Sequence, residues 1–294
     1  MAIVNQKVLD RIREGLKKFQ PIVESAKIRD VNESDTVVLL TGILSEVLGF
    51  DKYTDITTEL AIRGTFCDLA LKVNGKIEIL LEAKAVGIEL KEQHVKQAVD
   101  YAANKGIDWV ILTNGVSWKV YKILFLKPIQ NPIVFDLDFL RLRPKANEDL
   151  ELFSYLSKEA ISKLSLEDYY TQKQATNKFM VGNLLGEEPV LNAIRKELKN
   201  IYPDIKVSLD DIKNVLSKDV IKREILEGEE AEESKKKIAK AFKKKDKLKV
   251  EKSNVVSATE TSTDALIETS TEITNVESIP TDLVSNSDDT TSGN

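Results

Sequence analysis

The chain has 294 residues with 48 acidic and 43 basic side chains, one Cys and one His, and 42% of its residues are hydrophobic. This composition is typical of a soluble globular protein with one or two domains. It excludes an intramolecular disulfide and the usual zinc or other transition-metal sites, so a metal ion would have to be held by oxygen atoms. No stretch approaches the roughly 18 apolar residues of a membrane span, and the first residues lack a secretory pattern, so we expect a cytoplasmic protein without a membrane partner.

The first segments in chain order are predicted to be helices. QKVLDRIREGLKKF, residues 6–19, carries apolar side chains at helical spacing, and Pro21 is expected to interrupt or restart that helix. A second helix should begin after Asn32, a good N-cap, and run to Gly49. We therefore assign residues 1–30 to N-terminal helices and begin the next domain at residue 31.

After residue 50 the apolar pattern changes to a period of two, which indicates strands. Strands are expected at 54–60, 65–73, 76–85, 108–114 and 116–125, with a helix at 90–106 between the third and the fourth. A helix, three strands, a helix and further strands predict an α/β core over residues 31–145, with a mixed sheet flanked by helices.

The rest of the sequence divides by composition. A helical region is expected over 146–234, and residues 235–252 contain ten lysines, which either hold phosphate groups or form a solvated helix end. Residues 253–294 contain 17 Ser or Thr, eight acidic residues and no Lys, Arg or aromatic residue, so we expect this acidic tail to be disordered. The net charge of −5 for the whole chain therefore leaves +3 on residues 1–252.

Charged side chains lie on the predicted hairpin over 65–85. Glu82 and Lys84 are two apart in the strand IEILLEAKA and therefore share one face, and Asp68 lies on the preceding strand. Two carboxylates together with the Ala83 carbonyl are the oxygen ligands that Mg²⁺ prefers, and Mn²⁺ is a suitable substitute.

The turn of this hairpin decides whether the two carboxylates can meet. A two-residue Asn74-Gly75 loop sets Asp68 opposite Leu81, which leaves Asp68 and Glu82 on opposite faces of the sheet. A shared metal ion therefore requires a loop of odd length or a bulge elsewhere in the hairpin.

The pattern D-x13-E-x-K on a hairpin that follows a helix resembles the PD-(D/E)XK nuclease superfamily, although Cys67 stands in place of the Pro in its name. Gln97 and Tyr101, one helical turn apart, resemble the Q-x-x-x-Y element that follows the E-x-K strand in several nuclease branches.

Two further segments narrow the resemblance. NESDTVVLLTGILSEVLGF, residues 32–50, and TNGVSWKVY, residues 113–121, resemble the N-terminal domain of the type I restriction enzyme R subunit. The resemblance covers about residues 30–125, and more loosely the helical region to residue 234. It implies a restriction-endonuclease-like fold for the core.

The resemblance also implies roles for individual residues. Asp68, Glu82 and the Ala83 carbonyl would bind Mg²⁺, and Lys84 would orient or activate water. Gln97 and Tyr101 would hold a phosphate or the attacking water, with a plain surface pair as the alternative.

The family also has a glutamate on a helix, and the corresponding residue here would be Glu33. The alternative for Glu33 is a carboxylate that caps the helix or interacts with its dipole.

The expected function is that of a Mg²⁺-dependent DNA endonuclease of the restriction or defence type. The sequence lacks a G-x-x-x-x-G-K-[ST] loop, so it holds no ATP motor. It is expected to act either as a stand-alone nuclease or as a nuclease subunit whose targeting comes from a protein partner. The alternatives are a non-catalytic nucleic-acid-binding or regulatory module on the same fold, and an interaction adaptor acting through residues 146–234.

Overall fold

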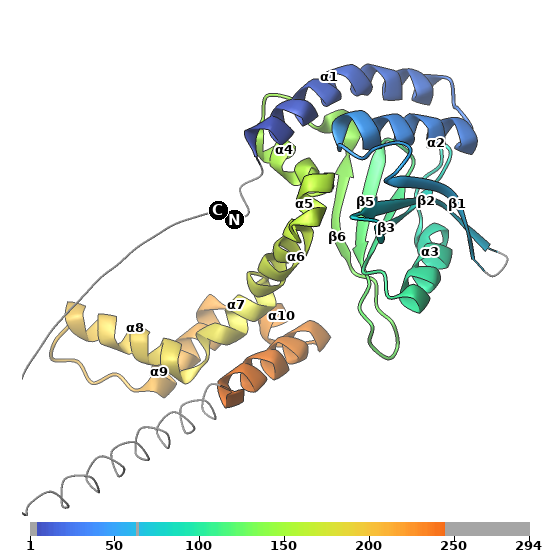
Figure 1. Cartoon of the computed structure of the whole chain (residues 1–294). Coiled ribbons are helices and arrows are strands. Elements are labelled where there is room, and N and C mark those ends of the chain that lie inside the picture. Colours follow the sequence, from blue (N-terminus) through green and yellow to red (C-terminus); the bar gives the residue numbers. More distant parts are fainter. Residues whose placement is uncertain (1–4, 63–64, 245–294) are drawn as a thin grey trace, which may run out of the picture. The chain divides into compact units, whose positions relative to one another are not determined.

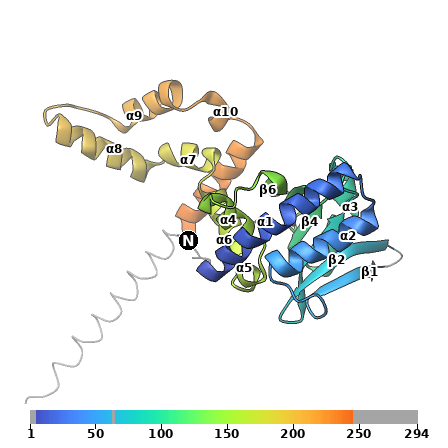
Figure 2. The same ribbon diagram turned by 90° about the horizontal axis from the view of Figure 1, so that it is seen from above.

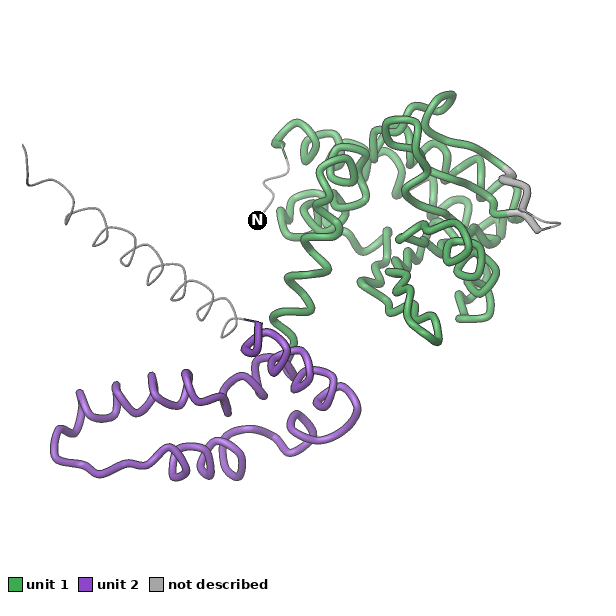
Figure 3. The backbone as a smooth tube through the Cα atoms, turned by 60° about the horizontal axis from the view of Figure 1, so that its bottom comes forward, with its two compact units in different colours: residues 1–177 green, residues 178–294 purple. Residues whose placement is uncertain are grey.

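The computed structural model describes residues 5–62 and 65–244, which form two compact units (Figures 1 and 3). The first unit is 1–177 and the second is 178–294. The predicted disordered tail over 253–294, and residues 245–252 of the lysine-rich segment, lie outside the described residues. Among the described helices, none has the length and apolar character needed to cross a membrane.

The N-terminal part consists of α1 (Gln6–Ile28), α2 (Glu33–Gly42) and the π-helix η1 (Ile43–Val47). The expected interruption at Pro21 is wrong, because α1 continues through it. Pro21 is exposed, while the buried stripe of α1 continues in register from Leu16 and Phe19 to Val23. The packing of this stripe keeps the helix intact although the proline lacks an N–H group.

The predicted mixed sheet is confirmed and has six strands in the order β1-β2-β3-β4-β5-β6. Neighbouring strands are antiparallel except β3 and β4, which are parallel and joined through α3 (Glu92–Lys105). A parallel pair needs such a crossover connection. The strands are β1 (Ile56–Ile62), β2 (Thr65–Val73), β3 (Lys76–Ala83), β4 (Trp109–Thr113), β5 (Ser117–Lys122) and β6 (Ile133–Asp138).

Helices cover both faces of the sheet, with α1 and α2 on one face and α3 on the other (Figures 1 and 2). Alternate residues of the central strands therefore enter two different apolar cores. The core below α1 and α2 includes Leu69, Leu71, Ile79, Leu81 and Ala83. The core below α3 includes Cys67, Ala70, Leu80, Val110 and Leu112.

Short helices after the sheet complete the first unit. They are η2 (Phe139–Arg141), α4 (Asn147–Ser154), α5 (Lys158–Ser162) and α6 (Ser165–Ala175). Phe153 of α4 is fully buried against Trp118 and Phe139, with ring centroids 5.6 and 5.5 Å away. These helices therefore pack into the same core as the sheet.

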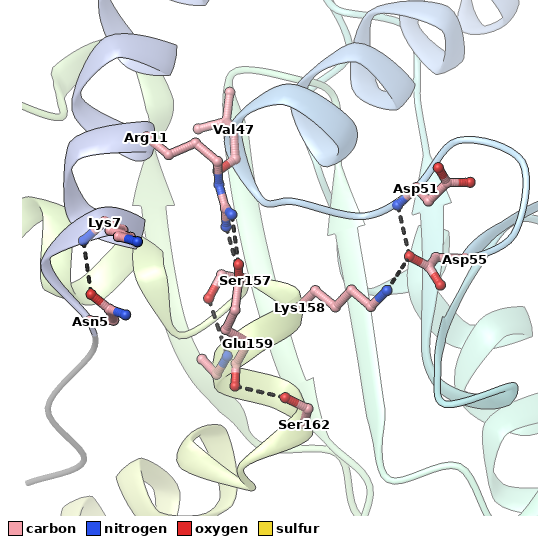
Figure 4. Close-up of polar contacts among 11 residues, drawn as sticks. Asn5, Lys7, Arg11, Val47, Asp51, Asp55, Ser157, Lys158, Glu159 and Ser162 are labelled. Carbon is pink, nitrogen blue, oxygen red and sulfur yellow. Dashed lines mark hydrogen bonds and ion pairs between the residues drawn. The ribbon is translucent and has the colours of Figure 1, made fainter.

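Ion pairs join this helical segment to the N-terminal half of the unit (Figure 4). Arg11 donates to both carboxylate oxygens of Glu159, at 2.6 and 2.8 Å, and to the Val47 carbonyl at 3.0 Å. Lys158 donates to Asp55 Oδ2 at 2.6 Å, and the same oxygen accepts the Asp51 N–H at 2.7 Å.

The second unit is entirely helical in the part that the structure describes. Its elements are α7 (Lys178–Leu185), α8 (Glu188–Ile201), α9 (Leu209–Val215), the π-helix η3 (Leu216–Val220), α10 (Arg223–Leu226) and a helix over 229–244. α7 lies against α10 at Gly182, where a Cβ atom would come within 2.4 Å of the Ile225 side chain. A larger residue at position 182 would therefore force these helices apart.

Candidate metal and nuclease site

The β2–β3 hairpin combines a tight turn with a bulge. Asn74 and Gly75 both have positive φ, 52° and 78°, and Val73 pairs with Lys76, so the loop has two residues. Further along the hairpin, Lys72 pairs with Ile77 but Leu71 pairs with Ile79, so Glu78 is an extra residue in β3. This bulge meets the requirement set by the tight turn, because it shifts the pairing by one residue and brings Asp68 next to Glu82.

Asp68 is half-buried where the pairing of β2 with β3 ends. The last pair is Leu69 with Leu81, and beyond it the Ala83 N–H donates to Asp68 Oδ2 at 2.7 Å. A side-chain oxygen therefore accepts the hydrogen bond that a strand carbonyl would otherwise take, and the carboxylate is held against the end of β3.

Glu82 lies on the α3 face of the sheet. It follows Leu80 at strand spacing and pairs with Leu112, and both leucines belong to the core below α3. Its side chain is only 10% exposed, and Oε2 is buried without a hydrogen-bond partner. Burial raises the pKa of Glu82; the Lys84 hydrogen bond opposes this rise, and the negative charge of Asp68 adds to it.

Lys84 places its ammonium among oxygen atoms. Its backbone N–H is anchored by the Thr113 carbonyl at 2.9 Å. Nζ lies 2.6 Å from the Ala83 carbonyl, 2.8 Å from Glu82 Oε1 and 3.4 Å from Glu33 Oε2. Burial lowers the pKa of Lys84, but the hydrogen bond to Glu82 and the surrounding negative charges outweigh it, so the pKa is raised.

Glu33 is the first residue of α2 and is 48% exposed. The capping role falls to Asn32, whose Oδ1 accepts the Asp35 N–H at 2.9 Å. Glu33 instead reaches Lys84, so it lies at the outer edge of the cluster formed with Asp68 and Glu82.

Gln97 and Tyr101 of α3 differ in exposure. Gln97 is exposed, whereas Tyr101 is 9% exposed and belongs to the core below α3. Burial raises the pKa of Tyr101, and the nearby Cys67 contributes. His94 lies in the first turn of α3, where Nδ1 accepts the Lys91 N–H at 3.2 Å, so it caps the helix.

Asn114 positions the segment that follows Lys84, a role that the sequence analysis did not assign to it. Its amide nitrogen donates to the carbonyls of Val86 and Ile88 at 3.1 and 2.9 Å. Its Oδ1 accepts the N–H groups of Val116 and Ser117 at 3.0 and 2.8 Å. A buried Asn with four such bonds ties the β4–β5 turn to the loop beside the site.

One family model matches the part of the chain that contains most of these charged residues. Residues 41–131 match the model of the type I restriction enzyme R protein N terminus. This match includes Asp68, Glu82 and Lys84, as well as Gln97 and Tyr101, whereas Glu33 lies outside it. No curated protein and no solved structure matched the chain.

The donor set of this restriction-related region suits a hard cation. Among the described residues, no group of three or more His, Cys, Asp or Glu is arranged to hold a metal ion. Mg²⁺, however, commonly uses only one or two carboxylates and keeps several water ligands. Asp68, Glu82 and the Ala83 carbonyl provide only oxygen atoms, and the buried Glu82 Oε2 has no partner. These residues therefore fit a magnesium ion.

Proposed function

We propose that the region similar to the restriction R protein N terminus is a metal-dependent endonuclease that hydrolyses phosphodiester bonds in DNA. The observation that carries the proposal is the unpartnered Oε2 of Glu82, beside Asp68 and Lys84 at the end of the β2–β3 hairpin. An unsatisfied buried carboxylate oxygen is costly, and perturbed ionisable groups gather at functional sites.

Each residue has a defined task in this proposal. Asp68, Glu82 and the Ala83 carbonyl would hold Mg²⁺ or Mn²⁺. When bound, such an ion would polarise the scissile phosphate and activate a water molecule. Lys84 holds a positive charge beside the scissile phosphate and orients the attacking water. Glu33 holds the Lys84 ammonium from the solvent side. Gln97 contacts a phosphate oxygen, and Tyr101 fixes the position of α3.

Incubation of the purified protein with supercoiled plasmid and Mg²⁺ or Mn²⁺, with EDTA as control, tests the proposal. Nicking should require the metal and should be abolished by Asp68→Asn, Glu82→Gln and Lys84→Met. Glu78→Gln is the matched control, because Glu78 lies in the same strand and its carboxylate forms an ion pair with Lys76 at 3.0 Å. Absence of metal-dependent cleavage in the wild type overturns the proposal.

A non-catalytic DNA-binding module is the second candidate. It is favoured by the Lys84 ammonium, which already satisfies Glu82 Oε1 and the Ala83 carbonyl. Isothermal titration with Mn²⁺ separates the two candidates. A nuclease should bind Mn²⁺ through Glu82, and binding should be abolished in Glu82→Gln, whereas the alternative requires DNA binding without metal binding at this site.

A further inference from the structure

A buried stripe fixes the rotation of the helix that the structure describes over residues 229–244 of the second unit. Ala231, Ser234 and Ile238 are 0%, 5% and 4% exposed, at spacings of three and four residues. At 100° per residue these three side chains share one side of the helix. The opposite side therefore faces solvent.

Five lysines lie on that opposite side and are exposed: Lys236, Lys237, Lys240, Lys243 and Lys244. Their directions at helical spacing fall within a sector of about 120°, centred opposite the buried stripe. Over the described residues, none of the five lies within ion-pair distance of a carboxylate, although the charge of Lys236 adds to the effect of Lys235 in lowering the pKa of Glu232. Lys235, outside this sector, is instead bonded to Glu232 at 2.7 Å and to the Leu226 carbonyl at 3.0 Å.

The clustering of the five lysines is unfavourable without a partner. Lys240 lies three or four residues from Lys236, Lys237, Lys243 and Lys244, and like charges at these spacings destabilise a helix. An extended anion with closely spaced charges would relieve the repulsion.

We propose that this lysine face binds the phosphate backbone of duplex DNA without reading its sequence. The proposal rests on the proposed function, which makes DNA the substrate. The first and last lysines of the face, Lys236 and Lys244, are eight positions apart, or about 12 Å along the helix axis at about 1.5 Å per residue. Since DNA carries one phosphate per about 3.4 Å of each strand, this length reaches several phosphates. The proposed partner of the lysine face is thus the same DNA that the site at Asp68 and Glu82 would cleave.

Fluorescence anisotropy with a labelled duplex of about 30 base pairs, in EDTA and over about 50–200 mM salt, tests the face directly. In the full chain, the five lysines are changed together to Gln. The matched control changes five exposed lysines of the same unit to Gln: Lys196, Lys199, Lys206, Lys213 and Lys218. A variant with Arg at the five face positions keeps the charge and should keep the binding.

The Gln variant should weaken binding at least about tenfold at low salt. The slope of log K against log salt should become shallower by about 0.9 for each phosphate that the variant no longer neutralises. Equal affinity and slope in the Gln variant and the matched control overturn the proposal, as does the absence of binding in the Arg variant. Duplex binding in EDTA does not depend on cleavage. Lysine-dependent binding without plasmid nicking would therefore overturn the nuclease assignment alone.

Discussion

Asp68 Oδ2 accepts the backbone N–H of Ala83 at 2.7 Å, so one proposed metal ligand also holds the main chain of another. Asp68 thus has two roles, as a hydrogen-bond acceptor for the Ala83 backbone and as a proposed metal ligand, and two substitutions can separate them. Asp68→Asn keeps an acceptor oxygen, and Asp68→Ala removes it.

We therefore expect Asp68→Ala to lower the free energy of unfolding by about 1 kcal/mol, and Asp68→Asn by much less. Both should abolish metal-dependent nicking, because neither retains a carboxylate. Urea unfolding and plasmid cleavage measure the two effects. Equal stability of the two variants would show that the bond to Ala83 is not significant in solution.

Glu82 should make stability depend on pH. Its folded-state pKa is raised by burial, so the protonated form favours folding, and this contribution is lost as the pH rises through the raised pKa. The stability of the wild type relative to Glu82→Gln should therefore fall between about pH 4 and the raised value. Thermal unfolding from pH 4 to 8 measures the difference, and a difference that grows with pH contradicts the assignment.

Asp55 should make the stability depend on pH in the opposite direction from Glu82. Burial raises its pKa, but the hydrogen bonds from Lys158 and the Asp51 N–H outweigh burial, so the pKa is lowered (Figure 4). Its stabilising contribution is present above the ordinary Asp pKa of about 3.9 and is lost as the pH falls through the lowered value.

Asp55→Asn should cost about 2 kcal/mol near pH 7 and less in acid. The exposed pair of Glu46 with Lys18 provides the control, and Glu46→Gln should change the stability by less than about 0.5 kcal/mol. Chemical denaturation at pH 7 and pH 3 checks both values. An Asp55→Asn cost that is as large at pH 3 as at pH 7 contradicts the assignment.

Cys67, the only cysteine in the sequence, should be inert in the folded protein. It is 2% exposed, and burial raises the pKa of its thiol to about 12. Near pH 8 the thiolate fraction is then roughly 10⁻⁴, and thiolate is the reactive form. Ellman's reagent should react only after unfolding, so rapid reaction in native buffer would show that this part of the core below α3 opens.

Removal of residues 253–294 should leave the melting temperature unchanged, because a segment without aromatic residues adds little to a core. If its eight acidic residues compete with DNA for the lysine face, truncation should tighten duplex binding at low salt and have little effect at high salt. Unaltered binding at both salt concentrations argues against such competition.

The sequence by itself determined the local elements. Asn32 caps the start of α2 and Gly49, with φ of 83°, ends the helical stretch, because capping and left-handed backbone depend on single residues. The period-two pattern predicted β1 to β5, and Asn74-Gly75 predicted the tight turn. The E-x-K spacing placed Glu82 and Lys84 together because residues two apart along a strand share one face. These features required no knowledge of distant parts of the chain.

Only the tertiary structure decided the register on which the candidate site depends. With the tight turn alone, Leu71 would face Glu78. The bulge at Glu78 instead pairs Leu71 with Ile79 and Leu69 with Leu81, all of which enter the core below α1 and α2. Burial of these four side chains sets the register, and Asp68 comes beside Glu82 as a consequence. Packing also explains why α1 continues through Pro21. The local tendency of proline to interrupt a helix is outweighed where the buried side chains of that helix pack into the core.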